Sequence, residues 1–353
     1  MLRVAIDTTP LYVTRAGTAR YVRGLLRGLR EECSPDEITE IAWPVQNFVF
    51  RQPRRALKTA YRELIWAPYL ATQQIRQSKC DLLHSTSGYF VRPPRGCPNV
   101  VTLHDLALLR YPERFRRWHR ISGHRRLRRV AQADRVICIS RFTADEAMQL
   151  LGLPAKKIEV VYNGGSSLHV EAHESEEPAG IPEEFFLFVG SLEPGKNLKL
   201  LRDVYAIANE AGTHLPPLVI VGARWPNVAS EGLPPGDWLY LGQQSDLNLA
   251  SLYRHAVALV FPSLYEGFGL PIIEAQLNGC PVICSPLSSL PEVAGSGALF
   301  AQQTPKSYLE MMRCIIKDNQ RRTALTEAGY RNASRFDWNR AAIETLTVYH
   351  SVV

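Results

Sequence analysis

The hydrophobic residues of this chain gather in two series of short apolar runs, and amphipathic stretches separate the runs. Short runs that are apolar throughout are typical of parallel strands covered on both faces. Strands that alternate with helices in this way predict a doubly wound α/β domain. The first series has runs at residues 2–6, 41–45, 82–83, 100–103, 136–139 and 160–162, with helical patterns such as 20–30 and 141–151 between them.

A second series of apolar runs starts at residue 185, after a break in the pattern. The break consists of a glycine-containing turn at residues 163–167 and a polar stretch at 171–182 with the composition of a linker. The second series has runs at residues 185–190, 218–222, 238–241, 257–261 and 282–284. We therefore predict an N-terminal Rossmann-like domain over 1–165, a linker over 166–182, a second Rossmann-like domain over 183–337 and a last helix over 338–353.

Length and composition agree with two domains, because 353 residues of which 46% are hydrophobic can fill two cores. The first apolar run ends at Asp7, and no run approaches the roughly 18 apolar residues of a membrane span. These features predict a cytoplasmic protein without a signal peptide. The seven cysteines are scattered and include no Cys-x-x-Cys pair, which predicts reduced core thiols and no zinc or redox site.

Charge is divided unevenly along the chain. Residues 1–165 hold 28 Lys and Arg against 14 Asp and Glu, a net charge of +14, whereas residues 166–353 hold 13 against 20, a net charge of −7. Nine arginines lie between Arg110 and Arg129. Apolar residues at near-helical spacing accompany them, namely Phe115, Trp118, Ile121, Leu127 and Val130.

A basic amphipathic helix of this type lies on an anionic membrane surface or faces a phosphorylated acceptor. The alternative is a helix docked by its apolar stripe, with solvated arginines outside. Nucleic acid is a less favoured partner, because no helix-turn-helix, zinc-finger or aromatic RNA-binding signature accompanies the charge.

The most informative stretch joins an apolar run to a helical pattern through two glycines. Gly267 and Gly269 let the backbone approach a ligand closely, and Pro271 suits the first helical turn. The unpaired amides of that turn and the positive end of the helix dipole favour an anion. Glu266 precedes the turn and Glu274 lies about one turn beyond Pro271, so the two carboxylates could bind different parts of one extended ligand. The alternative is an ordinary helix start with two solvated glutamates.

The string Glu266-Gly-Phe-Gly-Leu-Pro271, with Glu274, resembles the signature of glycosyltransferase family 4. Members of that family are retaining nucleotide-sugar transferases with the GT-B fold, in which two Rossmann-like domains face each other across a cleft. Residues 279–285 and 290–295 are also similar to the family. The resemblance implies that helix 338–353 packs back on the first domain. It also assigns Glu266 to the donor sugar as a catalytic residue and Glu274 to the ribose, and it assigns the sugar and diphosphate to the amides of Gly267, Phe268, Gly269 and Leu270.

Two segments of the first domain are similar to the family where open α/β sheets bind ligands, beyond the carboxyl ends of their strands. His104-Asp105 ends a strand and matches the family's His-Asp pair, so the resemblance makes both residues catalytic candidates, with His104 at the donor sugar. Gly17 opens a segment that follows the first strand, and we predict that it binds the donor, with Thr18 as the helix cap. Ala19 replaces the family's second glycine there, and an ordinary helix start is the alternative.

Two further residues in such segments are polar or charged. Ser140 is predicted to cap the helix that follows it. Lys196 follows the first strand of the second series at a helix start, where a lysine is unfavourable unless an anion accompanies it. We therefore predict that Lys196 binds the donor diphosphate. Ser191 and Gly195 stand where the family often has basic residues, and Arg20 or Arg141 could supply the missing charge.

The predicted chemistry uses neither a metal nor a cofactor beyond the nucleotide diphosphate sugar, because there is no Asp-x-Asp and no His/Asp cluster at ligand spacing. Helix amides and Lys196 would have to stabilise the leaving phosphate. Retention of anomeric configuration is implied by the resemblance alone. It fits a front-face mechanism in which the leaving phosphate oxygen takes the acceptor proton.

The resemblance is strongest to bacterial mannosyltransferase-like members that build surface polysaccharides. It favours mannose or a related GDP-hexose as the donor and a glycan or lipid-linked acceptor. One alternative is a sugar-nucleotide epimerase of the same fold, although epimerases do not share a string like that at Glu266–Pro271. Another is a non-catalytic membrane-surface module, which Ala19, Ser191 and Gly195 leave open. A Rossmann dehydrogenase is disfavoured, because no Gly-x-Gly-x-x-Gly follows a strand.

Overall fold

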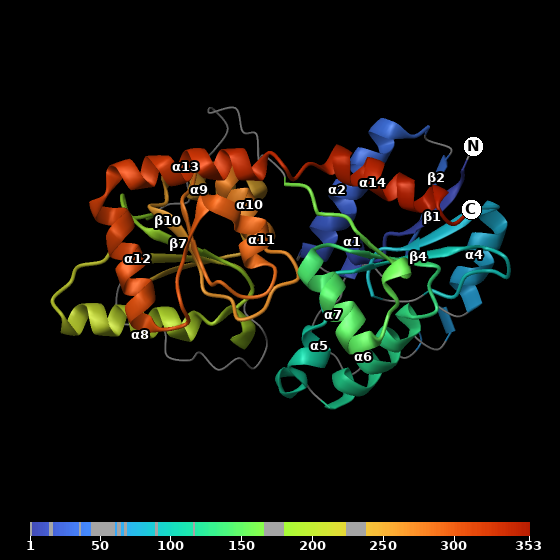
Figure 1. Cartoon of the computed structure of the whole chain (residues 1–353), viewed down its shortest axis with the longest axis horizontal. Helices are drawn as coiled ribbons and strands as arrows, with labels where there is room; N and C mark the ends of the chain where they lie inside the picture. The colour runs from blue at the N-terminus through green and yellow to red at the C-terminus, as the bar shows by residue number, and fades with distance from the viewer. Residues whose placement is uncertain are drawn as a thin grey trace. The chain divides into compact units, whose positions relative to one another are not determined.

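The chain folds into two compact units in the computed structural model (Figure 1). Unit 1 comprises residues 1–164 and 337–353, and unit 2 comprises residues 165–336. Most of the linker predicted over 166–182 lies outside the described residues. The structure describes residues 2–13, 17–34, 37–43, 61, 65–66, 69–88, 91–115, 117–165, 180–223 and 238–353.

Unit 1 is built on a six-stranded parallel sheet in the order β2-β1-β3-β4-β5-β6. Its strands are β1 (Val4–Asp7), β2 (Ile38–Ile41), β3 (Leu82–Ser85), β4 (Asn99–Leu103), β5 (Arg135–Cys138) and β6 (Ile158–Val160). Its helices are α1 (Pro10–Val13), α2 (Gly17–Glu32), α4 (Ala71–Ser78), α5 (Ala107–Arg110), η3 (Pro112–Arg114), α6 (Arg117–Val130), α7 (Arg141–Leu151), η4 (Ala155–Lys157) and α14 (Trp338–His350).

Unit 2 has a second six-stranded parallel sheet, in the order β12-β11-β10-β7-β8-β9. Its strands are β7 (Phe186–Val189), β8 (Leu218–Val221), β9 (Leu239–Gly242), β10 (Ala258–Phe261), β11 (Val282–Cys284) and β12 (Ala298–Phe300). Its helices are η5 (Pro194–Lys196), α8 (Leu198–Glu210), α9 (Asp246–His255), α10 (Leu270–Leu277), α11 (Leu290–Ala294), η6 (Gly295–Gly297), α12 (Pro305–Lys317) and α13 (Asn319–Ala333). The prediction of two doubly wound parallel-sheet domains is confirmed.

Both sheets reverse their strand order at one point. In unit 1 the chain moves outward from β1 to β2 and then returns to place β3 on the other side of β1. In unit 2 the same reversal occurs between β7 and β10. Connections leave the sheet in opposite directions at such a point, and ligands bind in the crevice that this opens beyond the carboxyl ends of the strands.

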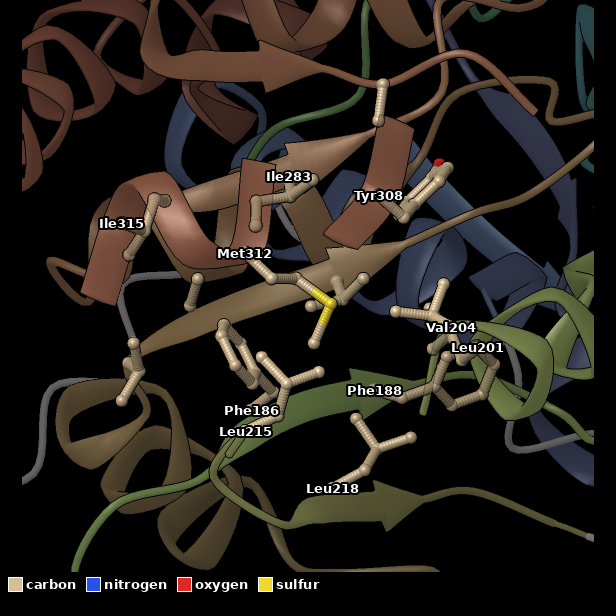
Figure 2. Close-up of a cluster of buried hydrophobic side chains, with 14 of the residues drawn as sticks. Phe186, Phe188, Leu201, Val204, Leu215, Leu218, Ile283, Tyr308, Met312 and Ile315 are labelled. Atoms are coloured by element: carbon tan, nitrogen blue, oxygen red, sulfur yellow. The ribbon is translucent and has the colours of Figure 1, made fainter. Parts of the chain in front are cut away.

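The core of unit 2 explains why the run at residues 185–189 is apolar throughout. Phe186 and Phe188 point to one face of the sheet, where α8 and α12 cover them (Figure 2). Phe185, Leu187 and Val189 point to the opposite face, where α9 and α10 pack. Because both faces of β7 are covered, every side chain along it is buried.

In unit 1, α14 packs closely on α2 through Trp338. A Cβ added to Gly24 would lie 2.1 Å from Cε2 of the Trp338 indole, and one added to Gly164 would lie 2.4 Å from the Trp338 backbone nitrogen. These glycines are therefore required by the close approach of the indole.

The strand predictions were least accurate at the sheet edges. The run at residues 41–45 was wrong, since β2 ends at Ile41, and the run at 160–162 was shifted by two residues from β6. The strand β12 was not predicted. All three are edge strands, and β2 and β6 are only partly buried, so their side chains alternate or mix in polarity. A search for wholly apolar runs misses such strands.

The arginine-rich segment is not one helix, as the prediction for residues 110–129 had it. It comprises α5, η3 and α6, with a break at Tyr111-Pro112 because proline cannot continue a helix. Arg116 and the Trp118 side chain lie outside the described part of the chain. Ile121 was expected in the docked apolar stripe but is 57% exposed, whereas Val130 is buried.

Candidate functional site

In unit 2 the structure brings together two residues that the sequence analysis had treated separately. Lys196 follows β7 and Glu266 follows β10, and these neighbouring strands flank the point where the strand order reverses. The ammonium of Lys196 donates a hydrogen bond to Oε1 of Glu266 at 2.5 Å. Their side chains retain 16% and 13% exposure, so the ion pair reaches solvent. A charged pair at this edge of the sheet is placed to meet a polar, anionic ligand.

The Lys196 loop is tied to the Glu266 loop by backbone and amide contacts. The backbone N–H of Leu264 donates to the carbonyl of Gly195 at 2.9 Å. The Asn197 side chain donates to Gln303, whose own amide donates to the Pro262 carbonyl at 3.1 Å. The two loops therefore form one connected structure.

Glycine is required where β8 ends beside this loop. Gly222 has a φ of +150°, and a Cβ there would lie 1.8 Å from the Gly190 carbonyl oxygen. The Lys196 stem passes Gly190, and its Nζ lies 5.4 Å from the centre of the Phe261 ring. The strand ends thus direct the long side chain of Lys196 toward Glu266.

Two serines hold the backbone of the Glu266 turn. The N–H of Glu266 donates to the hydroxyl of Ser288, and the hydroxyl of Ser289 donates to the carbonyls of both Glu266 and Phe268, each at 2.9 Å. Ser288 adopts a φ of +54°, a left-handed conformation uncommon for serine. Neither serine was predicted, because both lie between the segments 279–285 and 290–295 that resemble the family.

The glycine turn leads directly into α10, as predicted. Gly269 precedes the helix with a φ of +105°, and Leu270 is its first residue. The Phe268 ring packs edge-on against Phe336, so only its backbone is available to a ligand. Gly267 is buried in the same turn.

Glu274 has a structural partner. It is 4% exposed, and its Oε2 accepts a hydrogen bond from the Tyr253 hydroxyl at 3.2 Å. Its contact with a ribose stays a prediction.

In unit 1, His104 is the half-buried residue that follows β4. Its Nε2 lies 2.8 Å from the Thr86 carbonyl oxygen, which can only accept, so Nε2 carries the hydrogen of the neutral ring. The Tyr21 ring packs edge-on against the imidazole, with 4.8 Å between ring centres. Burial lowers the pKa of His104, although its bond to Thr86 opposes this. The structure therefore holds a neutral imidazole in one orientation.

Asp105 is exposed, and its Oδ1 accepts a hydrogen bond from the Ala107 N–H at the start of α5. Gly17 is the exposed first residue of α2, so Thr18 lies in the first turn, and the expectation that Thr18 caps the helix was wrong. Ser140 caps α7, as predicted, by accepting from the Thr143 N–H at 3.0 Å.

Arg141, proposed as a possible source of the missing charge, lines a cavity of about 380 Å³ in unit 1. The other charged residues that line the cavity are Arg340, Glu159 and Glu344, and Arg340 donates to Glu344 at 2.8 Å. Two carboxylates thus balance the two guanidinium groups of this cavity.

The arginine-rich segment contains both paired and solvent-facing cations. Arg110 forms a bidentate pair with the buried Glu146 of α7, although its own side chain stays 38% exposed. Five residues of α6 around the exposed Ile121 are themselves exposed: Arg117, Arg120, His124, Arg125 and Arg128. All except the adjacent Arg120 lie three, four or seven residues from Ile121, on its side of the helix. We call these six residues the α6 face.

The described residues contain neither a membrane-spanning helix nor a metal-binding cluster. Within the described ranges, none of the helices combines the length and apolar character needed to cross a bilayer. Among the side chains that the structure describes, no three His, Cys, Asp or Glu residues are grouped as a metal site. All seven cysteines are free, and burial raises the pKa of Cys138 and Cys280 to about 12.

Comparison with known proteins places both units in glycosyltransferase families. The family model described as glycosyl transferases group 1 matches residues 171–332, and the model of glycosyltransferase family 4 matches residues 15–165. The chain is 30% identical over 319 residues to the O-antigen chain mannosyltransferase B of Escherichia coli, covering 86% of this chain and 81% of that protein. The chain belongs to glycosyltransferase family 4. It is a nucleotide-sugar-dependent transferase, and the epimerase alternative was wrong.

Two further relatives of this family 4 enzyme match at lower identity. The serotype-specific mannosyltransferase WbdA of E. coli is 26% identical over 283 residues, and the match covers 73% of this chain but only 34% of WbdA. D-inositol 3-phosphate glycosyltransferase 1 of Catenulispora acidiphila is 28% identical over 300 residues, covering 75% of this chain and 69% of that protein.

Solved structures share the whole fold at low sequence identity. Sucrose-phosphate synthase from Thermosynechococcus elongatus matches with a TM-score of 0.77 at 19% identity, covering 99% of both chains. Anabaena HepE in complex with UDP and glucose matches with a TM-score of 0.71 at 16% identity, covering 100% of both chains. WaaG, described as a glycosyltransferase of lipopolysaccharide biosynthesis, matches with a TM-score of 0.70 at 14% identity, covering 98% of this chain and 99% of WaaG. These matches show that the family 4 enzyme has the GT-B fold.

Proposed function

We propose that this enzyme is a retaining hexosyltransferase that moves mannose or a related sugar from a nucleotide diphosphate sugar to a glycan or lipid-linked acceptor in cell-surface polysaccharide synthesis. The observation that carries the proposal is the Lys196–Glu266 ion pair at the strand-order reversal of unit 2. A cation and a carboxylate side by side match a donor that presents a diphosphate next to a hydroxyl-rich sugar.

The donor replaces the ion pair with two better-matched contacts. Its diphosphate takes the ammonium of Lys196, and the carboxylate of Glu266, released from the lysine, accepts hydrogen bonds from sugar hydroxyls. The amides at Gly267–Leu270 serve the diphosphate and sugar at the α10 N-terminus, and Glu274 binds the ribose. The resemblance assigns His104, Asp105 and Gly17 of unit 1 to the same reaction, with His104 at the sugar.

The neutral tautomer of His104 defines what that residue offers the sugar. Its Nε2 hydrogen is committed to the Thr86 carbonyl, so Nδ1 carries a lone pair. We assign that atom to a sugar hydroxyl as a hydrogen-bond acceptor.

The transfer step is a front-face substitution. The bond between the anomeric carbon and the phosphate oxygen breaks, and the acceptor oxygen bonds to that carbon from the same face. The acceptor proton passes to the departing phosphate oxygen, whose negative charge Lys196 and the α10 amides stabilise. No metal takes part in this sequence of events.

Mannose is favoured as the sugar because O-antigen chain mannosyltransferase B and WbdA are both mannosyltransferases. The same relatives support a polysaccharide acceptor. The decisive experiment is incubation of the purified enzyme with a panel of GDP- and UDP-sugars, with detection of the released nucleoside diphosphate. We expect GDP-mannose to be hydrolysed or transferred fastest, and the α-anomeric product in an NMR spectrum would establish retention. Release of nucleoside diphosphate from none of the donors would contradict the proposal.

The α6 face supports a position at the inner surface of the cytoplasmic membrane. Four arginines surround an exposed isoleucine there, as expected of a helix that lies in an anionic interface. Such a position would bring the enzyme to a lipid-linked acceptor.

A further inference from the structure

Unit 1 contains a buried chain of hydrogen bonds that the transfer reaction does not account for. The Tyr349 hydroxyl of α14 bonds to Nδ1 of His84 at 2.6 Å, and Nε2 of His84 bonds to the Thr102 hydroxyl at 2.8 Å. The Thr102 hydroxyl in turn bonds to the Tyr21 hydroxyl at 2.8 Å. These four residues come from α14, β3, β4 and α2, which are far apart in the sequence.

All members of the chain lie in the interior. His84 and Thr102 are fully buried, and Tyr21 and Tyr349 are 3% and 0% exposed. Burial, with a smaller contribution from the nearby His104, lowers the pKa of His84 to about 3. His84 is therefore neutral, and each of its ring nitrogens has a hydroxyl partner. An apolar side chain would fill the same place without needing partners, so the polar chain calls for an explanation.

The hydrogen-bond chain ends at Tyr21, which also contacts the ring of His104. Tyr21 uses its hydroxyl for Thr102 and its ring for the imidazole of His104. The Tyr21 ring also packs edge-on against Trp338, with 6.0 Å between ring centres. The Thr102 bond and the two ring contacts together hold Tyr21 in place.

His104 is consequently fixed by two contacts in different directions. The Thr86 carbonyl holds its Nε2, and Thr86 is itself anchored because its hydroxyl donates to the Asp7 carbonyl at 2.5 Å. The Tyr21 ring limits rotation of the imidazole about its side-chain bonds. The first contact sets the tautomer, and the second sets the ring orientation.

We propose that Tyr349, His84, Thr102 and Tyr21 form a positioning chain that holds the imidazole of His104 in its working orientation. These four residues do not contact the substrate, and they act only through His104. The inference rests on the proposed function, because that function assigns His104 to the donor sugar. Catalytic groups must be held close to their productive geometry by residues that are themselves fixed by packing and hydrogen bonds.

Substitutions at three positions test the proposal, because each removes a hydroxyl group and so interrupts the hydrogen-bond chain. Tyr21→Phe and Tyr349→Phe each remove one hydroxyl and keep the ring. Thr102→Val removes the shared central hydroxyl, whereas Thr102→Ser keeps it. We expect kcat/KM to fall about tenfold in the first three variants, mainly through kcat, and Thr102→Ser to stay within about threefold of wild type.

The combined effect of the two tyrosine substitutions on kcat/KM distinguishes one connected chain from two independent contributions. In the double variant Tyr21→Phe/Tyr349→Phe the loss should be no larger than about that of Tyr21→Phe alone, because the chain is already broken. Losses that multiply would show independent effects and would overturn the proposal. Tyr205→Phe is the matched control, since it removes a buried tyrosine hydroxyl in unit 2 that donates to the Pro216 carbonyl at 2.6 Å. Tyr205→Phe should leave kcat/KM within about twofold of the wild-type value.

A measurement without turnover separates this proposal from the proposed function. In protein labelled with ¹⁵N-histidine, two-bond ¹H–¹⁵N spectra report the tautomer and environment of each ring, and His104→Asn identifies the His104 signals. We expect these signals to move in Tyr21→Phe and Tyr349→Phe but not in Tyr205→Phe. Unchanged His104 signals in both chain variants would overturn the positioning chain, even in an active enzyme. If wild type released no nucleoside diphosphate but the signals moved, the proposed function would fail while the chain remained.

Discussion

Each unit has a six-stranded parallel sheet with one reversal of strand order, but the two units build their polar centres in opposite ways. In unit 2 the centre is an ion pair on two loops, partly exposed and held by backbone contacts from Gly195, Ser288 and Ser289. In unit 1 it is a neutral imidazole, His104, backed by hydroxyls and a second neutral histidine inside the core. The comparison teaches that charge is kept where solvent can reach it, and neutral groups are used where positioning requires burial.

The units differ in their outer surfaces as well. The basic excess of the chain lies in residues 1–165, and the exposed arginines of α6 are part of it, whereas residues 166–353 carry a net negative charge.

The largest expected effect concerns the surface contrast. Replacing Arg117, Arg120, Arg125 and Arg128 with glutamine should weaken binding to phosphatidylglycerol vesicles on the order of a thousandfold, since each arginine near an anionic surface contributes on the order of 1 kcal/mol. Sedimentation with vesicles measures this. Wild-type binding should also weaken steeply between low and physiological salt, where the Debye length falls to about 8 Å.

The matched control removes four exposed arginines of unit 2, Arg254, Arg313, Arg321 and Arg331, and changes the net charge equally. It should bind vesicles as wild type does. Equal losses of vesicle binding in both variants would show that net charge alone causes the binding. If wild type ignores the vesicles at low salt, the α6 face is a solvated surface and the acceptor is soluble.

The next effect concerns the charged centre of unit 2. Lys196→Ala and Glu266→Ala should each lower kcat/KM at least about a hundredfold, because each removes a group that acts on the charged transition state. Lys199→Ala, which removes an exposed lysine three residues away on α8, should have little effect. Nucleoside diphosphate release measures the rates. Wild-type turnover in folded Lys196→Ala and Glu266→Ala would remove both residues from the site.

A smaller effect concerns the neutral centre of unit 1. The pKa of His84 is about 3 in the folded chain and about 6.5 when unfolded, so the unfolded state binds the proton first as the pH falls. Stability should therefore decrease between pH 6.5 and 3. From pH 7 to pH 5 the loss from this residue is about 2 kcal/mol, and lowering of the His104 pKa acts in the same direction.

Urea unfolding at pH 7 and pH 5 tests this sign. His84→Asn should weaken the pH dependence, whereas His350→Asn should keep it, because His350 is exposed at the end of α14. An acid-induced loss of stability that is identical in all three proteins would show that His84 does not cause it.

The smallest expected effect is that of a chelator. Excess EDTA should leave the rate of nucleoside diphosphate release within about twofold, because Lys196 and the α10 amides carry the charge that a divalent cation would otherwise carry. A strict requirement for Mg²⁺ or Mn²⁺, restored when the ion is added back, would reveal a metal site and would remove the main electrostatic role of Lys196.

The sequence predicted the parts of the fold that depend on local pattern. The central strands are covered on both faces, so they read as unbroken apolar runs, and β7, β10 and β11 were located within about one residue. The glycine turn before α10 was also predicted, because only glycine accepts the backbone angle found at Gly269. The edge strands β2 and β6 were misplaced because polar residues interrupt their apolar pattern. The edge strand β12 is a short apolar run and was missed.

For the candidate site, the residue types were predictable and their partners were not. Lys196 and Glu266 were each identified from a motif, but their ion pair joins positions 70 residues apart and depends on β7 and β10 being neighbours. No role was predicted for the side chains of the positioning chain, and only Tyr21 lies in a segment that resembles the family. His84, Thr102 and Tyr349 lie in ordinary strand and helix patterns, where a polar residue among apolar ones gives no hint of its partner.

By itself the sequence determined the family, the two-domain α/β organisation and the chemical character of the donor-binding loop, because these follow from short motifs and local periodicity. Only the tertiary structure decided which polar groups are paired, which arginines are exposed and which histidine is neutral. The physical reason is that pairing and burial depend on strand order and helix packing over long sequence separations. Arg110 illustrates this, since only the fold commits it to Glu146 and leaves Arg117 in solvent.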